Sequence, residues 1–430
     1  MRKEFSRYVT MNILGMLGLS CYILADTYFV AGWLGENGLA ALNLAIPVYS
    51  LISGAGLMLG MGGGAKYTIL KSCHELEQGS RIFTNTIYLG IFISLLFEII
   101  GILFTNQIVI LLRADENTFE MSSIYLKILL LCSPFFLLNQ ILICFVRNDG
   151  NPKITMIAML TGSFSNIILD YGFIYLLHGG MKGAVIATCL SPVISIAVIS
   201  PYFIKKQNQF HLVKMLPEIP QMTRILMIGA ASFVTEVSGG IIMIVFNLLI
   251  YHLAGNTGIA SYGIIANISL VIISIDTGIA QGIQPLVSYE TWKNNHKNVI
   301  KIIKHALFLE IVLSIFIYLF LFIFASAIVS VFNKENNSTL QELAINGIRL
   351  YFTGCGLAGM NIIIASFLAS CEKPIQSNLI SMLRGIILMI PLSFLLARWG
   401  LLGVWLTYPT TEFLTGIMSI IFLVKQKRTP

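Results

Sequence analysis

Two aspartates lie inside long apolar stretches of the sequence, where an ionised side chain is costly. Asp26 falls in the run that continues to Val30, and Asp170 falls in the run from about 154 to 177. If these runs cross a membrane, a charge near the middle of one costs at least about 2.5–3.5 kcal/mol and usually faces a cavity or a partner. Both carboxylates are therefore candidates for ion binding or proton transfer.

Other oxygen-bearing side chains fall at the same depth. With a rise of about 1.5 Å per helical residue, Asp26, Asp170 and Thr188 each lie about six or seven residues from the same end of their helices. Asn166 precedes Asp170 by four residues and so shares its helical face one turn away, and Tyr22 stands in the same relation to Asp26. Two carboxylates, an amide and a hydroxyl thus share one level.

This combination of groups suits a small cation or a proton. Hard cations prefer oxygen ligands, and two neighbouring carboxylates can also hold a proton and exchange it for a cation. In the structural alternative, Asp26 and Asp170 merely cap or bridge helices through water. We expect Asp26, Asn166, Asp170 and Thr188 to form one site that takes a proton or, as metal ligands, Na⁺.

A second group of polar residues lies near the middle of later apolar runs. A carboxylate of Glu236 or Asp276 that faces a cavity would attract cationic amphipathic molecules, and a structural hydrogen bond is the alternative. Gln281 and Gln284 flank a glycine before Pro285, which suits a kinked helix that exposes polar groups. The expected substrate-contacting residues are Tyr22, Asn139, Glu236, Asp276, Gln281 and Gln284.

Three further charges inside apolar runs, Glu310, Arg384 and Glu412, have no unique interpretation. Each either pairs with another charge or faces a cavity. Asn139 and Asn361 occupy matching positions in the two halves of the chain, where they either line a cavity or bond across helices.

The elements that carry these residues must be membrane helices. Of the 430 residues 11% are charged and 56% are hydrophobic, whereas soluble proteins have about 25% charged residues. A bilayer core needs about 20 apolar residues per helix. Apolar runs and breakers predict twelve spans at roughly 8–32, 39–65, 82–112, 122–146, 154–177, 181–204, 222–254, 258–289, 302–332, 341–371, 375–399 and 400–424.

Basic residues predict which way the spans face. Alternate loops hold 20 of the 27 Lys and Arg residues, and such loops are retained on the cytoplasmic side. Both termini are therefore expected in the cytoplasm of a cell whose plasma (inner) membrane holds the protein. The longest linker, 205–221, divides the chain into an N-terminal lobe at 1–204 and a C-terminal lobe at 222–430.

The two halves repeat each other. The segment from Gly35 to Ala41 aligns with the segment from Gly255 to Ser261 at an offset of 220 residues. Asn139, Phe145 and Pro152 align with Asn361, Phe367 and Pro374 at an offset of 222. Because each half has six spans, the halves share one orientation, and parallel repeats around a site are a common plan in transporters.

The organisation resembles the multidrug and toxic compound extrusion (MATE) family over nearly the whole chain, in particular prokaryotic members with an aspartate on the first helix. The resemblance is carried by Ala25 to Phe29 with Gly32 and Gly35, by Asn166 to Asp170, by Gly183, Ala184 and Thr188, and by Gln281 to Pro285.

The resemblance implies an all-α integral membrane protein with two pseudo-symmetric six-helix lobes around a V-shaped cavity. It also implies secondary active export of cationic or amphipathic drugs by antiport with H⁺ or Na⁺. The family's cation site in the amino-terminal lobe maps onto Asp26, Asn166, Asp170 and Thr188. Unlike some archaeal members, this chain lacks a proline in the first helix, which puts a proton-driven bend of that helix in doubt.

Other functions fit the sequence less well. No GxxxxGK[ST] motif is present, so ATP is not the direct energy source. Clustered acids such as DDxxD are absent, which argues against a membrane prenyltransferase, and we expect no enzymatic activity. A flippase for lipid-linked sugars or peptidoglycan precursors is the alternative. We expect a monomer in the lipid bilayer with small-molecule substrates, no nucleic-acid partner, and no cofactor beyond the coupling ion.

Overall fold

The computed structural model describes residues 2–333 and 337–428, and all regular structure in these two ranges is helical. Residue 1 and residues 429–430, at the outer ends of the two predicted lobes, lie outside the described residues. The α-helices are α1 (Arg2–Ser72), α2 (Leu76–Leu103), α3 (Thr105–Leu111), α4 (Glu116–Leu131), α5 (Ser133–Asn148), α6 (Pro152–Asp170), α7 (Gly180–Ile204), α8 (Ile219–Trp292), α9 (His296–Phe332), α10 (Ser338–Tyr351), α11 (Cys355–Ser370), α12 (Pro374–Met382), α13 (Met389–Leu396) and α14 (Leu401–Arg428).

The helices supply the predicted twelve spans. Ten helices in the described ranges are long and apolar enough to cross a membrane, and the pair α4–α5, bent by 49°, makes eleven. That count takes α8 as a single helix of 74 residues, although its backbone leaves helical geometry at Gly255. Divided there, α8 provides two spans. Pro134 stands at the start of α5, so a proline accompanies the bend between α4 and α5.

The turns inside α1 and α8 confirm the internal repeat. Gly35 has φ 64° and ψ −153°, and Gly255, 220 residues later, has φ 60° and ψ −155°. A side chain would strain the backbone in this region, whereas glycine enters it freely. The same residue type thus reverses the chain between the first two spans of each half.

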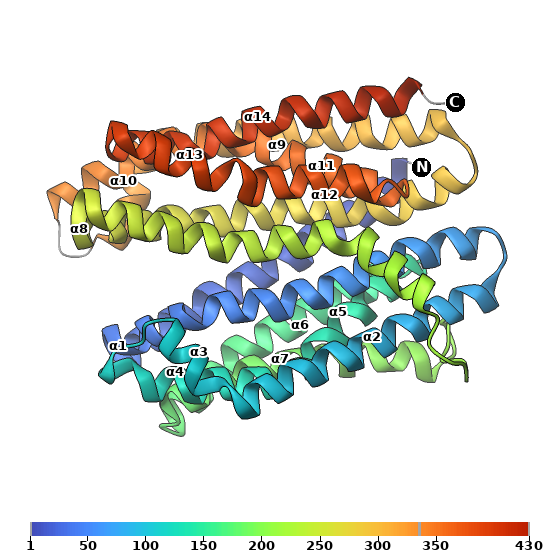
Figure 1. Ribbon diagram of the computed structural model, residues 1–430, viewed down its shortest axis with the longest axis horizontal. Helices are drawn as coiled ribbons and strands as arrows, with labels where there is room; N and C mark the ends of the chain where they lie inside the picture. Colours follow the sequence, from blue (N-terminus) through green and yellow to red (C-terminus); the bar gives the residue numbers. More distant parts are fainter. Residues whose placement is uncertain (1, 334–336, 429–430) are drawn as a thin grey trace.

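The helices form two bundles, α1–α7 and α8–α14 (Figure 1). One apolar core runs through the first bundle, and the second bundle holds two more. The bundles separate toward the end that carries the Gly35 and Gly255 turns. They come together toward the end where both chain termini lie (Figure 1).

Glycines bring the backbones of α1 and α8 into contact between the bundles. A Cβ atom at Gly62 would lie 2.0 Å from the carbonyl oxygen of Ile225, and one at Gly229 would lie 1.9 Å from that of Met58. Real Cβ atoms do not come this close, so any side chain at Gly62 or Gly229 would push the bundles apart.

Two spans change their helical pitch beside buried polar residues. A π-helical segment, η1 (Tyr171–Leu176), begins directly after Asp170, and a second, η3 (Leu383–Ile387), contains Arg384. These segments lie in the fifth span of each half. Short π-helical segments are rare and often occur at functional sites, because the extra residue redirects the neighbouring side chains.

The linker between the bundles is fixed by one buried carboxylate. Asp149 Oδ1 accepts bonds from the Tyr67 hydroxyl (2.6 Å) and Lys71 Nζ (2.7 Å). Its Oδ2 accepts bonds from the Tyr202 hydroxyl (2.6 Å) and the Gln209 backbone N–H (2.9 Å). Asp149 therefore ties the start of the linker to three helices of the first bundle.

Replacing Asp149 with alanine should strongly destabilise the protein. The change leaves an ammonium group and two hydroxyls without their acceptor, and breaking a buried charge pair costs roughly 3–5 kcal/mol. Thermal unfolding of the purified protein, followed by gel filtration after heating, measures the loss. The exposed Glu75 on the same side of the bundle provides the control. An equal fall in unfolding temperature for Asp149→Ala and Glu75→Ala would contradict the assignment.

Candidate cation site and lobe interface

The four residues predicted to share a cation site come together in the first bundle. Asp26 lies on α1, Asn166 and Asp170 on α6, and Thr188 on α7, and each is at most 6% exposed. In the amide orientation that satisfies both neighbours, Asn166 Nδ2 donates to Asp170 Oδ2 (3.0 Å), and its oxygen accepts from the Thr188 N–H (3.3 Å). Asn166 thus connects α6 to α7 and orients the carboxylate.

A tyrosine that is not among the residues predicted from the sequence belongs to the same group. Tyr125 on α4 is buried and lies within electrostatic range of both Asp26 and Asp170. Its phenol hydroxyl inside an apolar run is the same kind of signal as the Thr188 hydroxyl. Tyr125 lies only about three residues from the predicted start of its span, so the depth match of six or seven residues did not select it.

Two carboxylate oxygens of this group have no hydrogen-bond partner. Asp26 Oδ1 and Asp170 Oδ1 are both buried and unpaired, and the two carboxylates are close enough to interact electrostatically. Burial of two unneutralised carboxylates is unfavourable, so the arrangement suits a proton or a small cation between them. No group of three or more His, Cys, Asp or Glu residues within 2–333 and 337–428 could hold a metal ion. The donor set, two acids with neutral oxygens, matches the chemistry of Na⁺ or H⁺.

Tyr22 and Asn139, both predicted to contact substrate, lie in the first bundle. The Tyr22 hydroxyl shares a 2.7 Å hydrogen bond with that of Tyr49, and Tyr22 lies within electrostatic range of Asp26. Asn139 on α5 is half-buried, and its Oδ1 has no hydrogen-bond partner. Its repeat mate Asn361 is fully buried and bonds to Glu412.

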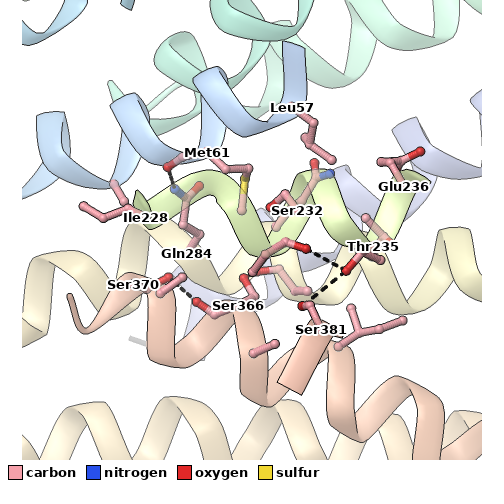
Figure 2. Close-up of a pocket in the computed structure, with 18 residues that line it drawn as sticks. Leu57, Met61, Ile228, Ser232, Thr235, Glu236, Gln284, Ser366, Ser370 and Ser381 are labelled. Carbon is pink, nitrogen blue, oxygen red and sulfur yellow. Dashed lines mark hydrogen bonds between the residues drawn. The ribbon is translucent and has the colours of Figure 1, made fainter. Parts of the chain in front are cut away.

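Three of the predicted substrate-contacting residues line a pocket between the bundles. Glu236, Gln281 and Gln284 reach it from α8, and α1, α11 and α12 complete its wall (Figure 2). The Thr235 hydroxyl donates to that of Ser381 (3.4 Å) on the wall that the second bundle forms (Figure 2). The free volume of about 50 Å³ holds a few water molecules. A drug-sized molecule therefore requires the bundles to separate here.

Asp276 does not line this pocket. Gly278, two residues later, faces α1, where an added Cβ would lie 2.7 Å from Ile13 Cα. Residues two apart on a helix point in nearly opposite directions, so Asp276 faces the interior of the second bundle, where Glu310 is its neighbour.

A fully buried arginine joins the bundles beside the pocket. Arg147 Nη1 donates to Asn12 Oδ1 (2.8 Å) on α1 and to Gln281 Oε1 (2.6 Å) on α8. Its Nη2 lies 3.5 Å from Gln284 Oε1. Gln284 also donates to the Met61 carbonyl oxygen at 2.8 Å (Figure 2). Arg147 and the two glutamines therefore hold the bundles together.

Two further contacts cross the same interface. Lys66 on α1 pairs with Glu372 of the second bundle (3.0 Å), and the Ser20 hydroxyl donates to that of Ser274 (2.5 Å). The interface thus combines tight backbone packing with a small number of polar bonds, which a rearrangement of the bundles would have to break.

The MatE family model matches residues 12–172 and 230–395. This chain belongs to the MatE family. It is a multi-pass membrane protein of the MATE transporters, which are transport proteins and not enzymes.

Curated relatives and solved structures agree with membership of the MATE family. The multidrug export protein MepA of Staphylococcus aureus (strain MRSA252) is 27% identical over 437 residues, covering 99% of this chain and 95% of the relative. MepA of Staphylococcus saprophyticus is 27% identical over 435 residues, again covering 99% of this chain and 95% of the relative.

A crystal structure of MATE in complex with MaL6 superposes with a TM-score of 0.93 at 21% identity, covering 99% of this chain and 96% of that one. An outward-facing MATE family transporter of the MOP superfamily gives 0.91 at 21% identity, covering 99% and 95%. The structures confirm the expected fold.

Proposed function

We propose that this MATE transporter exports cationic or amphipathic organic compounds by antiport with H⁺ or Na⁺. The buried, incompletely bonded Asp26–Asp170 group carries the proposal, because it offers a binding place for the driving ion within one bundle. Relatives that are named multidrug export proteins support the substrate class. The coupling ion is the only cofactor required.

The bundle arrangement supports a mechanism of alternating access. In the structure α1 and α8 close one end of the interface, and Arg147 and Gln281 bond across it. Binding of a cation at Asp26 and Asp170 would favour one bundle arrangement only if its affinity differs between the two arrangements. We propose that the ion and the organic substrate compete for the first bundle, which couples entry of the ion to export of the substrate.

The proposed location is the plasma membrane, with both termini in the cytoplasm. The termini lie at one end of the molecule (Figure 1), and the basic loops lie at that end by the count of spans. One chain supplies every residue of the candidate ion site and of the pocket between the bundles, so we propose that the monomer transports.

Transport into liposomes tests the function directly. Purified protein is reconstituted, and uptake of ethidium, an aromatic monocation, is followed under a proton gradient, a sodium gradient, or neither. Uptake that responds to one gradient and stops with the matching ionophore supports antiport and identifies the ion. Uptake that is independent of both gradients would contradict ion coupling.

Glu236 should contribute to selection of cationic substrates. Glu236 is one of the residues that line the pocket (Figure 2), and Glu236→Gln removes a negative charge while preserving the shape. We expect the KM for ethidium to rise by roughly tenfold, equivalent to about 1.4 kcal/mol, with little effect on a neutral amphipathic substrate. Ser232→Ala, on the same wall, serves as control. Equal losses for both substrates would assign Glu236 a structural role.

A further inference from the structure

The third span of each half begins with the same local geometry. His74 before α2 and Asn294 before α9 are 220 residues apart, and both have a left-handed backbone, with φ 61° and 51°. At the same offset Ile82 of α2 matches Ile302 of α9, and both side chains are buried in the apolar cores. The first turns of α2 and α9 are therefore equivalent positions of the internal repeat.

On α2, the face that points away from the core is covered by the linker between the bundles. Four side chains of this face bond to linker residues: Arg81 to Glu218 (3.4 Å), Thr84 to the Val213 N–H (3.0 Å), Asn85 to the Glu218 N–H (2.9 Å) and Tyr88 to the Met215 carbonyl oxygen (3.0 Å). The outermost contact is an ion pair between a basic side chain of the helix and a carboxylate that the linker brings.

The matching face of α9 has no such cover. Its four equivalent residues are Lys301, Lys304, His305 and Phe308, and all four are exposed. His305 lies at one edge, where its Nδ1 donates to the Lys301 carbonyl oxygen (2.6 Å) and its ring contacts that of Phe5 (5.9 Å between centroids). Within 2–333 and 337–428, no hydrogen bond, ion pair or ring contact involves the side chains of Lys301, Lys304 or Phe308.

The charge of the two faces also differs. Residues 71–89 of the first half have a formal net charge of zero, whereas the matching residues 291–309 contain four lysines and no acid. Lys297, Lys301 and Lys304 follow each other at intervals of four and three residues, so they lie along one face of α9. The start of α9 thus presents three exposed lysines whose charge the described protein does not neutralise.

The same face continues as an apolar stripe toward the middle of the span. Phe308, Val312 and Ile315 follow Lys304 at helical spacing, and they are 70%, 48% and 55% exposed. Helix α9 is long and apolar enough to cross a membrane, and the loop before it lies at the end of the molecule that carries both chain termini (Figure 1). Lysines at the end of a lipid-facing stripe match the order of groups in a phospholipid, whose headgroup precedes its acyl chains.

We propose that Lys297, Lys301 and Lys304 bind the headgroup of an anionic phospholipid, whose acyl chain lies along Phe308. In the first bundle the Glu218 carboxylate meets Arg81, and at the equivalent Lys301 the lipid phosphate takes the place of that carboxylate. A zwitterionic lipid brings a positive group of its own, which offsets the attraction. The surface therefore selects headgroups with a net negative charge. This binding requires only a protein that spans a membrane, so it is independent of the proposed antiport.

Native mass spectrometry of the purified full-length protein tests the proposal. The protein in detergent is mixed with equal amounts of phosphatidylglycerol and phosphatidylcholine that carry the same acyl chains, and bound lipids are counted. We expect wild type to bind phosphatidylglycerol in preference. Lys301→Gln/Lys304→Gln should weaken that binding by roughly fivefold for each lysine and leave binding of phosphatidylcholine unchanged.

Two further variants make the measurement specific. Lys205→Gln/Lys206→Gln removes the same charge from exposed positions at the start of the linker, and it should retain the preference of wild type. Lys301→Arg/Lys304→Arg keeps the charge and should bind as wild type does. Equal losses in the two glutamine variants would indicate attraction by net charge alone. That result, a wild type without preference for phosphatidylglycerol, or a preference that survives Lys301→Gln/Lys304→Gln would overturn the proposal.

Discussion

Asparagine at position 26 or 170 is expected to abolish gradient-driven uptake of ethidium while the protein still folds and inserts. Asp26 and Asp170 bring the only two charges to a site whose other members, Asn166, Thr188 and Tyr125, are neutral. Changes in groups that merely support a metal ligand typically cost about 10–100-fold in affinity. Loss of a direct charged ligand should cost at least that much, which brings uptake close to the level of protein-free liposomes.

An acid outside the site provides the control for this pair of variants. Asp115 caps the N-terminus of α4 on the exposed surface, where its side chain accepts from the Thr118 N–H (2.9 Å). Asparagine caps helices about as well as aspartate, so Asp115→Asn should transport like wild type. Gradient-driven uptake at the wild-type rate by both Asp26→Asn and Asp170→Asn would remove the basis of the proposed coupling.

Methionine at position 147 is expected to open the contact between the bundles. Arg147 is fully buried, and it donates to Asn12 and Gln281 while facing Gln284. Methionine fills a similar apolar volume but removes the arginine donor from the amide oxygens of Asn12 and Gln281. Hydrogen bonds to a charged group are worth about 1.5–3 kcal/mol each, so the population of the separated arrangement should rise by roughly tenfold or more.

A native thiol reports on this opening. Cys144 is 1% exposed and packs with Leu57 and Met61 beside Arg147, whose Nη2 lies 3.4 Å from the sulfur. In a protein with the other six cysteines replaced by serine or alanine, a water-soluble maleimide should label Cys144 faster after Arg147→Met.

The same substitution at Arg224 controls for loss of an arginine. Arg224 pairs with Glu372 within the second bundle, at 3.2 Å, so Arg224→Met should leave Cys144 protected. Unchanged labelling in Arg147→Met would show that the packing of α1 against α8 closes the interface without the arginine.

The membrane character, the spans, the repeat and the grouping of Asp26, Asn166, Asp170 and Thr188 were all predictable from the sequence. A low charge content identifies lipid as the solvent, and runs of apolar residues have the length that a bilayer requires. Asp26, Asn166 and Asp170 could be found because helical rise converts sequence distance into depth. The aligned segments that begin at Gly35 and Gly255 indicated the repeat, and both positions have a backbone that glycine adopts most easily.

Tertiary structure alone decided which way the side chains of the second bundle face and which of its charges pair. The sequence left Glu310, Arg384 and Glu412 without unique roles and suggested that Asp276 faces a cavity. Depth alone cannot tell which neighbouring helix a side chain meets, because each helix can rotate about its axis without changing its hydropathy. In the structure, packing of Gly278 against α1 turns Asp276 toward Glu310. Arg384 forms an ion pair with Glu412.

Arg147 is a second residue whose surroundings the sequence did not predict. By sequence it was one of many basic residues at a predicted cytoplasmic loop, where such residues usually remain in water. Only the approach of α1 and α8, through glycines such as Gly62 and Gly229, encloses it between the bundles. The sequence by itself determined the solvent, the spans and the depth of each charge. Packing between helices distant in sequence determined which charges meet, because partner choice depends on rotation and contact, which a linear pattern does not encode.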